Sequence, residues 1–449
     1  MRHPATILAA LGALLVALTI GGLLFFWGAE GKPDYDLRLD ILVGLIIGAV
    51  FVYFAAVRVA LRHSLPPQTV WIVLAVATVL RLALLPAPPL LSSDIYRYVW
   101  DGRVQAAGIN PFKYVPADPA LAALRDEDIY PSINRRDYAP TIYPPAAQIV
   151  FAAVGLMNGG VLAMKAVMLA FEALAIGCMI ALLGRLGLPR ERILIYAWNP
   201  LTLWSFACDG HVDALAIGCL GLALLLRSLR RDGLAGAAIA GATLSKFFPV
   251  AVAPAFVRGG SFWRPAGIGL AIILALYGLY ASAGSQIFGF LSGYRSEEGL
   301  DTGSGFWLLA GLNHLAPLPS WATGFYITAI VVIYASIVLS MLRARETRER
   351  EDGIRLCRDA AILAAFATAA VSPHYPWYFA WLALPCVVAP IPSVIWLSAA
   401  PALLYIDPLD DRFLWSTLIY GPALLLTAIR IVKPRFHRVG TLHMQQQSP

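Results

Sequence analysis

Residues 7–27 read ILAALGALLVALTIGGLLFFW, a run without one charged side chain. A membrane-spanning helix needs about 20 consecutive apolar residues. The run therefore predicts a helix that crosses a bilayer. It exceeds the apolar core of about 7–15 residues of a signal peptide and has no clear small-x-small cleavage pattern before Trp27, so we expect it to be retained. Residues 39–61 form a second, nearly uninterrupted apolar run.

The composition extends this prediction to the whole chain. Of 449 residues, 14% are charged and 59% are hydrophobic, and the mean hydropathy is +0.70. Soluble domains have about 25% charged residues, so a soluble protein is excluded. We expect an all-α polytopic membrane protein with about 12–14 transmembrane helices in a single integral membrane domain, residues 1–449. The expected spans are 6–27, 39–61, 69–86, 161–184, 193–208, 212–227, 233–246, 247–257, 265–284, 321–342, 359–371, 377–391, 393–406 and 413–432.

Lysines and arginines predict the orientation, because cytoplasmic loops carry an excess of them. They cluster near residues 58–62, 185–192, 227–231, 258–264, 343–358 and 433–438. Placing these clusters inside makes both termini cytoplasmic, and it explains the net charge of +7 without nucleic acid. The longer polar segments then lie outside: 28–38, 87–160, 285–320, 372–376 and 407–412. We expect residues 87–160 to form a large folded outer loop with interfacial helices, and 285–320 a second outer loop.

The large loop contains the strongest functional signal. Residues 92–103 read SSDIYRYVWDGR, in which a serine or Asp94 can cap a helix that ends at the Gly and Asn-Pro of residues 108–111. Asp94, Arg97 and Asp101 then share one face. A carboxylate held in this way can accept a proton from a substrate hydroxyl. The alternative is an ordinary interfacial helix with an i,i+4 ion pair, whose aromatic residues lie at headgroup level.

This loop also carries a family resemblance. The run DIYRYVWDGRVQAAGINPFKY and the later YPPAAQ resemble the first outer loop of GT-C membrane glycosyltransferases, especially bacterial polyprenol-phosphate-mannose-dependent mannosyltransferases and glycosyltransferase family 87. WNPL, GHVDA, LSKFFP and SPHYPWY extend the resemblance across residues 90–380. It implies a GT-C-like bundle in which Asp94, or as second choice Asp101, is the catalytic base. The loop here follows the expected third span rather than the first.

Two further segments carry isolated polar residues. His211 and Asp213 lie in CDGHVDA, where they could contact a sugar hydroxyl or a metal, or could simply belong to a helix turn. The resemblance places this segment in the wall of the active cavity. Lys246 follows thirteen small and apolar residues, so it is either functional or extended to the interface. The resemblance directs it at a lipid-phosphate donor.

Aromatic residues mark the remaining outer junctions. Tyr143 precedes two prolines that stiffen the return to the membrane, and His374 and Tyr375 lie in SPHYPWY, where aromatics can stack on a sugar or mark the interface. Residues 294–301 are either a solvated loop or a lid on the acceptor side. We expect substrate contacts from Tyr96, Trp100, His211, Asp213, Tyr143 and Tyr375. Lys246, Arg97, Arg103 and His374 are the expected donor-phosphate ligands.

Together these features predict a glycosyltransferase of the cytoplasmic membrane. The resemblance implies that it moves a sugar, best assigned as mannose, from a polyprenyl-phosphate donor to a hydroxyl of a glycan, glycolipid or lipid, with inversion. Its active site is expected on the extracytoplasmic side. No cofactor is assigned, and the spacing does not indicate a divalent metal. The alternative is a secondary transporter or lipid flippase, which should show repeated halves.

Overall fold

The computed structural model describes residues 4–28, 31–257, 262–343, 349–406 and 413–444, with side chains to residue 431 in the last range. The expected outer segment 407–412, Arg2, Arg258 and the side chains of Lys433–Arg438 lie outside this description. The helices are α1 (Pro4–Phe26), α2 (Tyr35–Arg62), α3 (Thr69–Leu84), α4 (Asp94–Ala106), α5 (Pro145–Leu156), α6 (Val161–Arg185), α7 (Leu194–Ala197), α8 (Pro200–Thr202), α9 (Asp213–Ser228), α10 (Asp232–Ser245), α11 (Trp263–Leu279), α12 (Leu291–Glu297), α13 (Trp307–Leu315), α14 (Ala322–Leu342), α15 (Glu349–Val371), α16 (Ala383–Cys386), α17 (Pro392–Leu397) and α18 (Leu414–Met444).

Short 3-10 helices connect these α-helices, and one connecting segment, η4, is a π-helix. They are η1 (Pro119–Leu124), η2 (Tyr130–Ser132), η3 (Arg190–Ile193), η4 (Leu203–Cys208), η5 (Phe248–Phe256), η7 (Ala281–Phe288), η8 (Pro376–Leu382) and η9 (Ala400–Tyr405). The described residues contain no β-strand. The chain is therefore an all-α polytopic membrane protein, as the composition predicted.

The number of full-length spans is smaller than the 12–14 expected. Among the described residues, five helices are long and apolar enough to cross a membrane: α1, α2, α6, α14 and the part of α18 from Leu414 to Ile431. The number rises to seven if each of two bent pairs counts as one span. Several expected spans are instead short or broken. Proline explains part of this, because it removes a helical hydrogen bond, as at Pro200 and Pro254.

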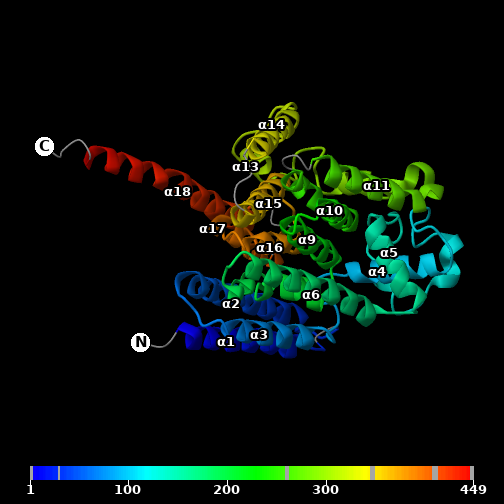
Figure 1. The fold of residues 1–449 in the computed structure, drawn as a ribbon. Helices are drawn as coiled ribbons and strands as arrows, with labels where there is room; N and C mark the ends of the chain where they lie inside the picture. The colour runs from blue at the N-terminus through cyan, green and yellow to red at the C-terminus, as the bar shows by residue number, and fades with distance from the viewer. Residues whose placement is uncertain (1–3, 29–30, 258–261, 344–348, 407–412, 445–449) are drawn as a thin grey trace.

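The helices pack side by side in layers (Figure 1). Helices α1, α2 and α3 form one group, and α6, α9 and α10 follow it across the molecule toward α11. A buried ion pair joins the first two groups, since Arg81 of α3 donates two hydrogen bonds, of 2.9 and 2.6 Å, to Glu172 of α6. Both side chains are at least nine-tenths buried. Such a pair requires both partners, because loss of one would leave a buried charge alone.

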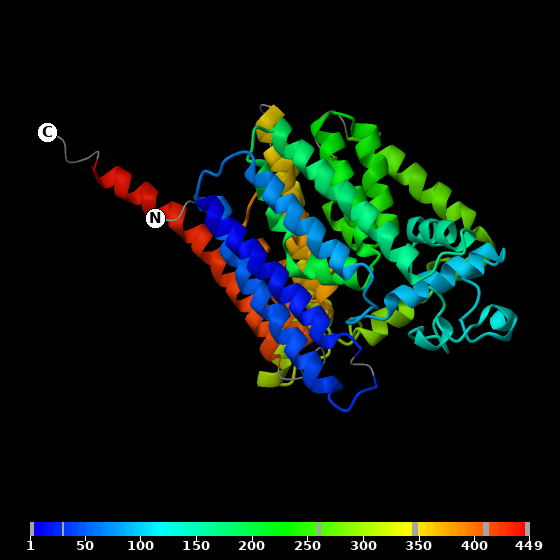
Figure 2. The same cartoon turned by 90° about the horizontal axis from the view of Figure 1, so that it is seen from below.

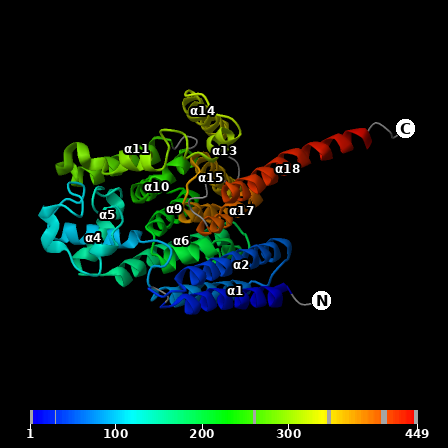
Figure 3. The same ribbon diagram turned by 180° about the vertical axis from the view of Figure 1, so that it is seen from behind.

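The two ends of the bundle differ in chemistry. At one end, Arg350 donates to the Leu186 carbonyl over 2.8 Å, and Arg185 donates to the Ser228 carbonyl over 3.3 Å. These contacts bring together the ends of α6 and α9 and the start of α15. Helix α1 begins and α18 ends on this side of the molecule, whereas α4 and α5 lie on the opposite side (Figures 2 and 3). The basic clusters and the large loop thus lie at opposite ends.

The large loop is attached through an unusually close contact between α4 and α5. A Cβ on Gly102 would lie 2.3 Å from the Phe151 carbonyl oxygen, and a Cβ on Gly155 would lie 2.2 Å from the Gly102 carbonyl oxygen. Only glycine permits this backbone approach. The two helices therefore pack as one unit beside the bundle.

Candidate active site

Helix α4 begins and ends where the sequence predicted. Its first residue is Asp94, whose amide lies 3.3 Å from the Ser92 hydroxyl, and Gly108 adopts a positive φ of 76° just after the helix. Asn110 then accepts a hydrogen bond from the Phe112 amide over 3.1 Å, which closes the expected Asn-Pro turn. This local chemistry places Asp94 at the positive end of the helix dipole, which favours a carboxylate.

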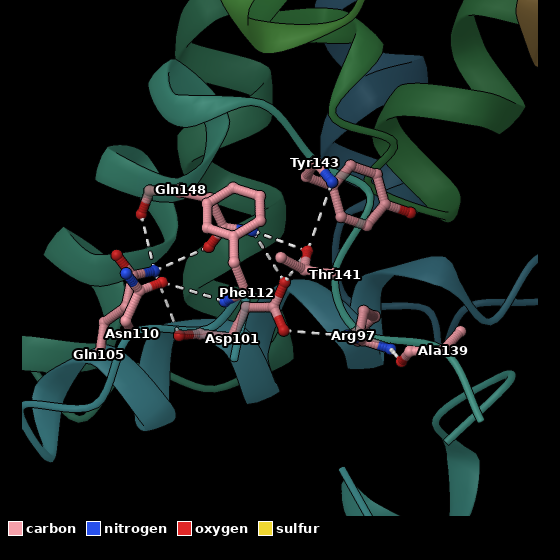
Figure 4. A network of polar contacts seen from close by, with 9 residues as sticks. All are labelled: Arg97, Asp101, Gln105, Asn110, Phe112, Ala139, Thr141, Tyr143 and Gln148. Carbon is pink, nitrogen blue, oxygen red and sulfur yellow. Dashed lines mark hydrogen bonds and ion pairs between the residues drawn. The ribbon is translucent and has the colours of Figure 1, made fainter. Parts of the chain in front are cut away.

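A buried polar network fixes the middle of α4 (Figure 4). Asp101 accepts from Arg97 over 2.9 Å with one oxygen, and from Thr141 over 2.5 Å and Gln148 over 2.9 Å with the other. Arg97 also donates to the Ala139 carbonyl over 3.1 Å. Because every oxygen of Asp101 already has a partner, this network ties residues 139–148 to the face of α4.

The second outer segment packs against the large loop. Arg135 donates to Glu297 over 2.6 Å, and Tyr138 donates to the same carboxylate over 2.9 Å. The Phe290 amide donates to the Thr141 carbonyl over 3.2 Å. The two segments that the sequence predicted to lie outside therefore meet at the same end of the bundle.

A cavity of about 720 Å³ lies where these segments meet the bundle. Its walls come from the start of α4, residues 134–144, residues 246–251, α12, the end of α15 and residues 375–378. Of the predicted site residues, the cavity wall includes Asp94, Arg97, Tyr143, Lys246 and Tyr375. Segments far apart in the sequence, from Leu91 to Tyr378, thus contribute to one chamber.

Of the described residues that line the cavity, Asp94 is the one that carries a carboxylate. One oxygen accepts a hydrogen bond from Asn134 over 2.7 Å, and the side chain keeps 18% of its surface exposed. Arg97 forms its ion pair with Asp101 instead. Asp94 is therefore held in place by Asn134 and accessible from the chamber.

His211 lies directly behind Asp94. Its Nδ1 is 3.7 Å from the second Asp94 oxygen, and its ring stacks on Trp377 with centroids 4.2 Å apart. The side chain is 1% exposed, and neither ring nitrogen has a hydrogen-bond partner among the described residues. The GHVDA segment thus reaches the same site as the large loop.

Lys246 enters the cavity from the end of α10. The chain leaves helical geometry at this residue, and its Nζ lies 3.1 Å from an Asp213 oxygen and 4.4 Å from the centre of the Tyr378 ring. The Tyr378 hydroxyl is 2.7 Å from that of Tyr294 on α12. A lysine in this setting offers a compact positive charge beside apolar walls.

Among the described residues, seven predicted site residues lie outside the cavity wall. Two of them, His211 and Asp213, contact the wall residues Asp94 and Lys246 from behind. The other five lie further away. Asp101 is buried in the α4 network, and Trp100 is buried with its ring 5.6 Å from that of Tyr130. Tyr96 is half-buried. Arg103 forms an ion pair with Asp126. Burial alone would raise the pKa of Asp126, but Arg103 and two backbone amides lower it below its usual value of 3.8. His374 lies 3.2 Å from Glu298 and is 44% exposed.

Several cavity residues were not among the predicted site residues, and Asn134 and Arg135 are two polar examples. Asn134 and Arg135 lie in an irregular stretch with no helical periodicity or motif. Their position depends on the fold of the loop, so no local signal identified them. In the described part of the chain, no group of three or more His, Cys, Asp or Glu side chains is arranged to hold a metal ion.

The fold and site together define a polytopic membrane protein with a carboxylate and a lysine in one chamber. The family model for "Alpha-(1->6)-mannopyranosyltransferase, N-terminal domain" matches residues 6–259. The chain belongs to this family, and it is therefore a glycosyltransferase. The matched region contains Asp94, His211 and Lys246, whereas residues 375–378 lie beyond it.

One curated relative extends the similarity. Alpha-(1->6)-mannopyranosyltransferase A of Mycobacterium tuberculosis (strain ATCC 25618 / H37Rv) is 24% identical over 415 residues, which cover 82% of this chain and 77% of that protein. No solved structure matches the chain.

Proposed function

We propose that the chain transfers mannose from a polyprenyl-phosphate donor to an acceptor hydroxyl, within a GT-C-type fold and on the extracytoplasmic side. The observation that carries this proposal is the position of Asp94 in a chamber that also contains Lys246. Membership of a mannosyltransferase family supports the sugar. The separation of the basic end from the chamber supports the orientation.

The reaction is a single displacement. The acceptor oxygen attacks the anomeric carbon as Asp94 takes its proton, the bond from that carbon to the phosphate oxygen breaks, and the electron pair leaves with the polyprenyl phosphate. Attack opposite the leaving group inverts the configuration. Asn134 fixes one carboxylate oxygen over 2.7 Å, and His211 lies 3.7 Å from the other, so the carboxylate is held at the chamber wall. Preorganisation of this kind lowers the barrier.

The charges in the chamber wall support a phosphate leaving group. Among the described residues, four cations line it, namely Arg97, Arg135, Lys246 and Arg295. The first three pair with carboxylates behind the wall, those of Asp101, Glu297 and Asp213. Arg295 forms no ion pair within 4 Å among the described residues. Cations placed where negative charge develops stabilise the transition state. Lys246 and Arg295 are the proposed phosphate ligands.

The apolar part of the wall supports a lipid-linked donor. Phe248, Val250, Leu291 and Val371 line the chamber next to Lys246. Val250 is 55% exposed on the outside of the bundle. A prenyl chain can lie along such a surface while its phosphate meets the lysine.

The test is a transfer assay with the purified chain in lipid nanodiscs. Labelled mannose is supplied as a polyprenyl-phosphate ester in one arm and as a nucleotide sugar in the other, with membrane extracts as acceptor. We expect a mannosylated product, identified by mass spectrometry, from the lipid donor alone. Product from the nucleotide sugar alone would contradict the lipid donor. Movement of the donor across vesicles without a product would favour a flippase.

Replacing Lys246 should weaken donor use. Lys246→Met is expected to raise KM for the lipid donor and to lower kcat, with a combined loss of about 10²–10³-fold in kcat/KM, because the leaving phosphate loses a charge partner. The measurement is steady-state transfer. The substitution also leaves Asp213 unpaired, at 10% exposure.

A double variant separates these effects. Lys246→Met with Asp213→Asn removes both charges of the pair. Any stability that the single variant loses through the unpaired Asp213 should then be regained, so the melting temperature should return toward that of wild type while transfer stays impaired. Recovery of transfer in the double variant would show that Lys246 acts only by neutralising Asp213.

A further inference from the structure

A second cleft lies at the end of the bundle opposite the chamber. It has a volume of about 790 Å³, and its walls come from residues 60–71, which join α2 to α3, and from residues 187–192, which follow α6. No step of the transfer reaction uses this cleft. The chemistry of its walls therefore calls for a separate explanation.

The walls of the cleft are strongly basic. They contain Arg62, Arg190 and Arg192 against one carboxylate, Glu191, so two positive charges are unbalanced when His63 is neutral. Within the residues that the structure describes, none of these arginines has an ion pair within 4 Å. An excess of Lys and Arg on the cytoplasmic side accounts for their number, but their gathering in one cleft also creates a local positive potential that attracts anions.

Two of these arginines have confined side chains, namely Arg192 and Arg190. The Arg192 Nε is buried and has no hydrogen-bond partner among the described residues. Buried donors are nearly always satisfied, so this atom indicates a missing acceptor. The Arg190 guanidinium lies across Gly184, where an added Cβ would be 2.9 Å from its Nη2. The missing glycine side chain leaves room for this arginine.

The surroundings place the cleft at the level of lipid headgroups. It lies at the ends of α2 and α6, both long and apolar enough to cross a membrane. Trp71 and Leu61, which also line it, are 69% and 37% exposed. Tryptophan is enriched at membrane interfaces, and basic pockets between spans bind anionic headgroups.

We propose that this cleft binds the phosphate of an anionic phospholipid, with Arg62, Arg190 and Arg192 around the headgroup and the acyl chains beside Leu61 and Trp71. Free phosphate offers the same charge, but it makes no use of the exposed apolar residues at the rim. The site is distinct from the donor chamber, and it goes beyond the transfer reaction.

The experiment measures lipid retention by the intact chain. Native mass spectrometry records bound phosphatidylglycerol after exchange from mixed phosphatidylglycerol and phosphatidylcholine nanodiscs, and a parallel titration uses inorganic phosphate. The cleft variant is Arg62→Gln, Arg190→Gln and Arg192→Gln. The control variant is Arg264→Gln, Arg343→Gln and Arg430→Gln, which removes the same charge from exposed positions outside the cleft.

We expect the cleft variant to lose phosphatidylglycerol by at least about tenfold, because its three arginines line one cleft and each contributes about fivefold when it surrounds a bound anionic headgroup. The control variant should bind like wild type. Equal loss in both variants, or loss in neither, would overturn the proposal, as would tight binding of inorganic phosphate alone. Melting in phosphatidylcholine discs checks folding. If the triple variant is unfolded, Arg192→Gln alone must still lower lipid retention.

Discussion

The Asp94→Asn variant is expected to lose mannosyl transfer by about 10²–10⁴-fold, the usual contribution of a general base. Asparagine keeps the size of the side chain and its contact with Asn134, but it cannot take the acceptor proton. The loss should appear in kcat, measured by transfer of labelled mannose at saturating donor. The melting temperature should stay close to that of wild type, since Asp94 forms no ion pair with Arg97.

A carboxylate in the same loop gives the matched control. Asp137 is 75% exposed and lies 3.8 Å from Arg136 at the surface. Asp137→Asn should leave transfer unchanged, because a solvated surface pair contributes little. If Asp94→Asn retains wild-type activity, Asp94 is not the general base, and another residue must accept the proton.

The Asp101→Asn variant should affect stability more than chemistry. Arg97 is 5% exposed and has Asp101 as its ion-pair partner, so the substitution leaves a buried guanidinium without its counter-charge. Breaking a buried pair costs about 3–5 kcal/mol. The expected result is a clear fall in melting temperature, measured in nanodiscs.

Removing both charges tests this explanation. The double variant Arg97→Gln with Asp101→Asn should regain part of the lost stability, because no unpaired charge remains. If Asp101→Asn melts like wild type yet fails to transfer mannose, Asp101 takes part in the reaction directly.

Much of the fold follows from the sequence. Apolar runs without charge, such as residues 7–27, predicted the long helices, and the turn chemistry at Gly108 and Asn110 predicted the end of α4. The span count was less predictable. Hydropathy records that a segment is apolar, but it does not record whether prolines break the segment into shorter pieces inside the bundle.

Motifs in the sequence named several residues that the fold brings together. Asp94, Lys246 and Tyr375 were named from separate segments, and all three line one chamber. Their meeting point could not be read from sequence, because it depends on how the loops pack on the bundle. The sequence alone does not distinguish Asp94 from Asp101, because both lie on the same helix; the structure places Asp94 in the chamber wall and Asp101 in the buried α4 network.

The contact of Gly102 with Gly155 has a counterpart at the start of α12. There the Phe290 amide donates to the Thr141 carbonyl over 3.2 Å, and a Cβ on Gly289 would overlap the same oxygen. At both places backbone lies directly against backbone, with no side-chain layer between. A side chain larger than hydrogen at Gly102, Gly155 or Gly289 would therefore displace a segment that lines the chamber.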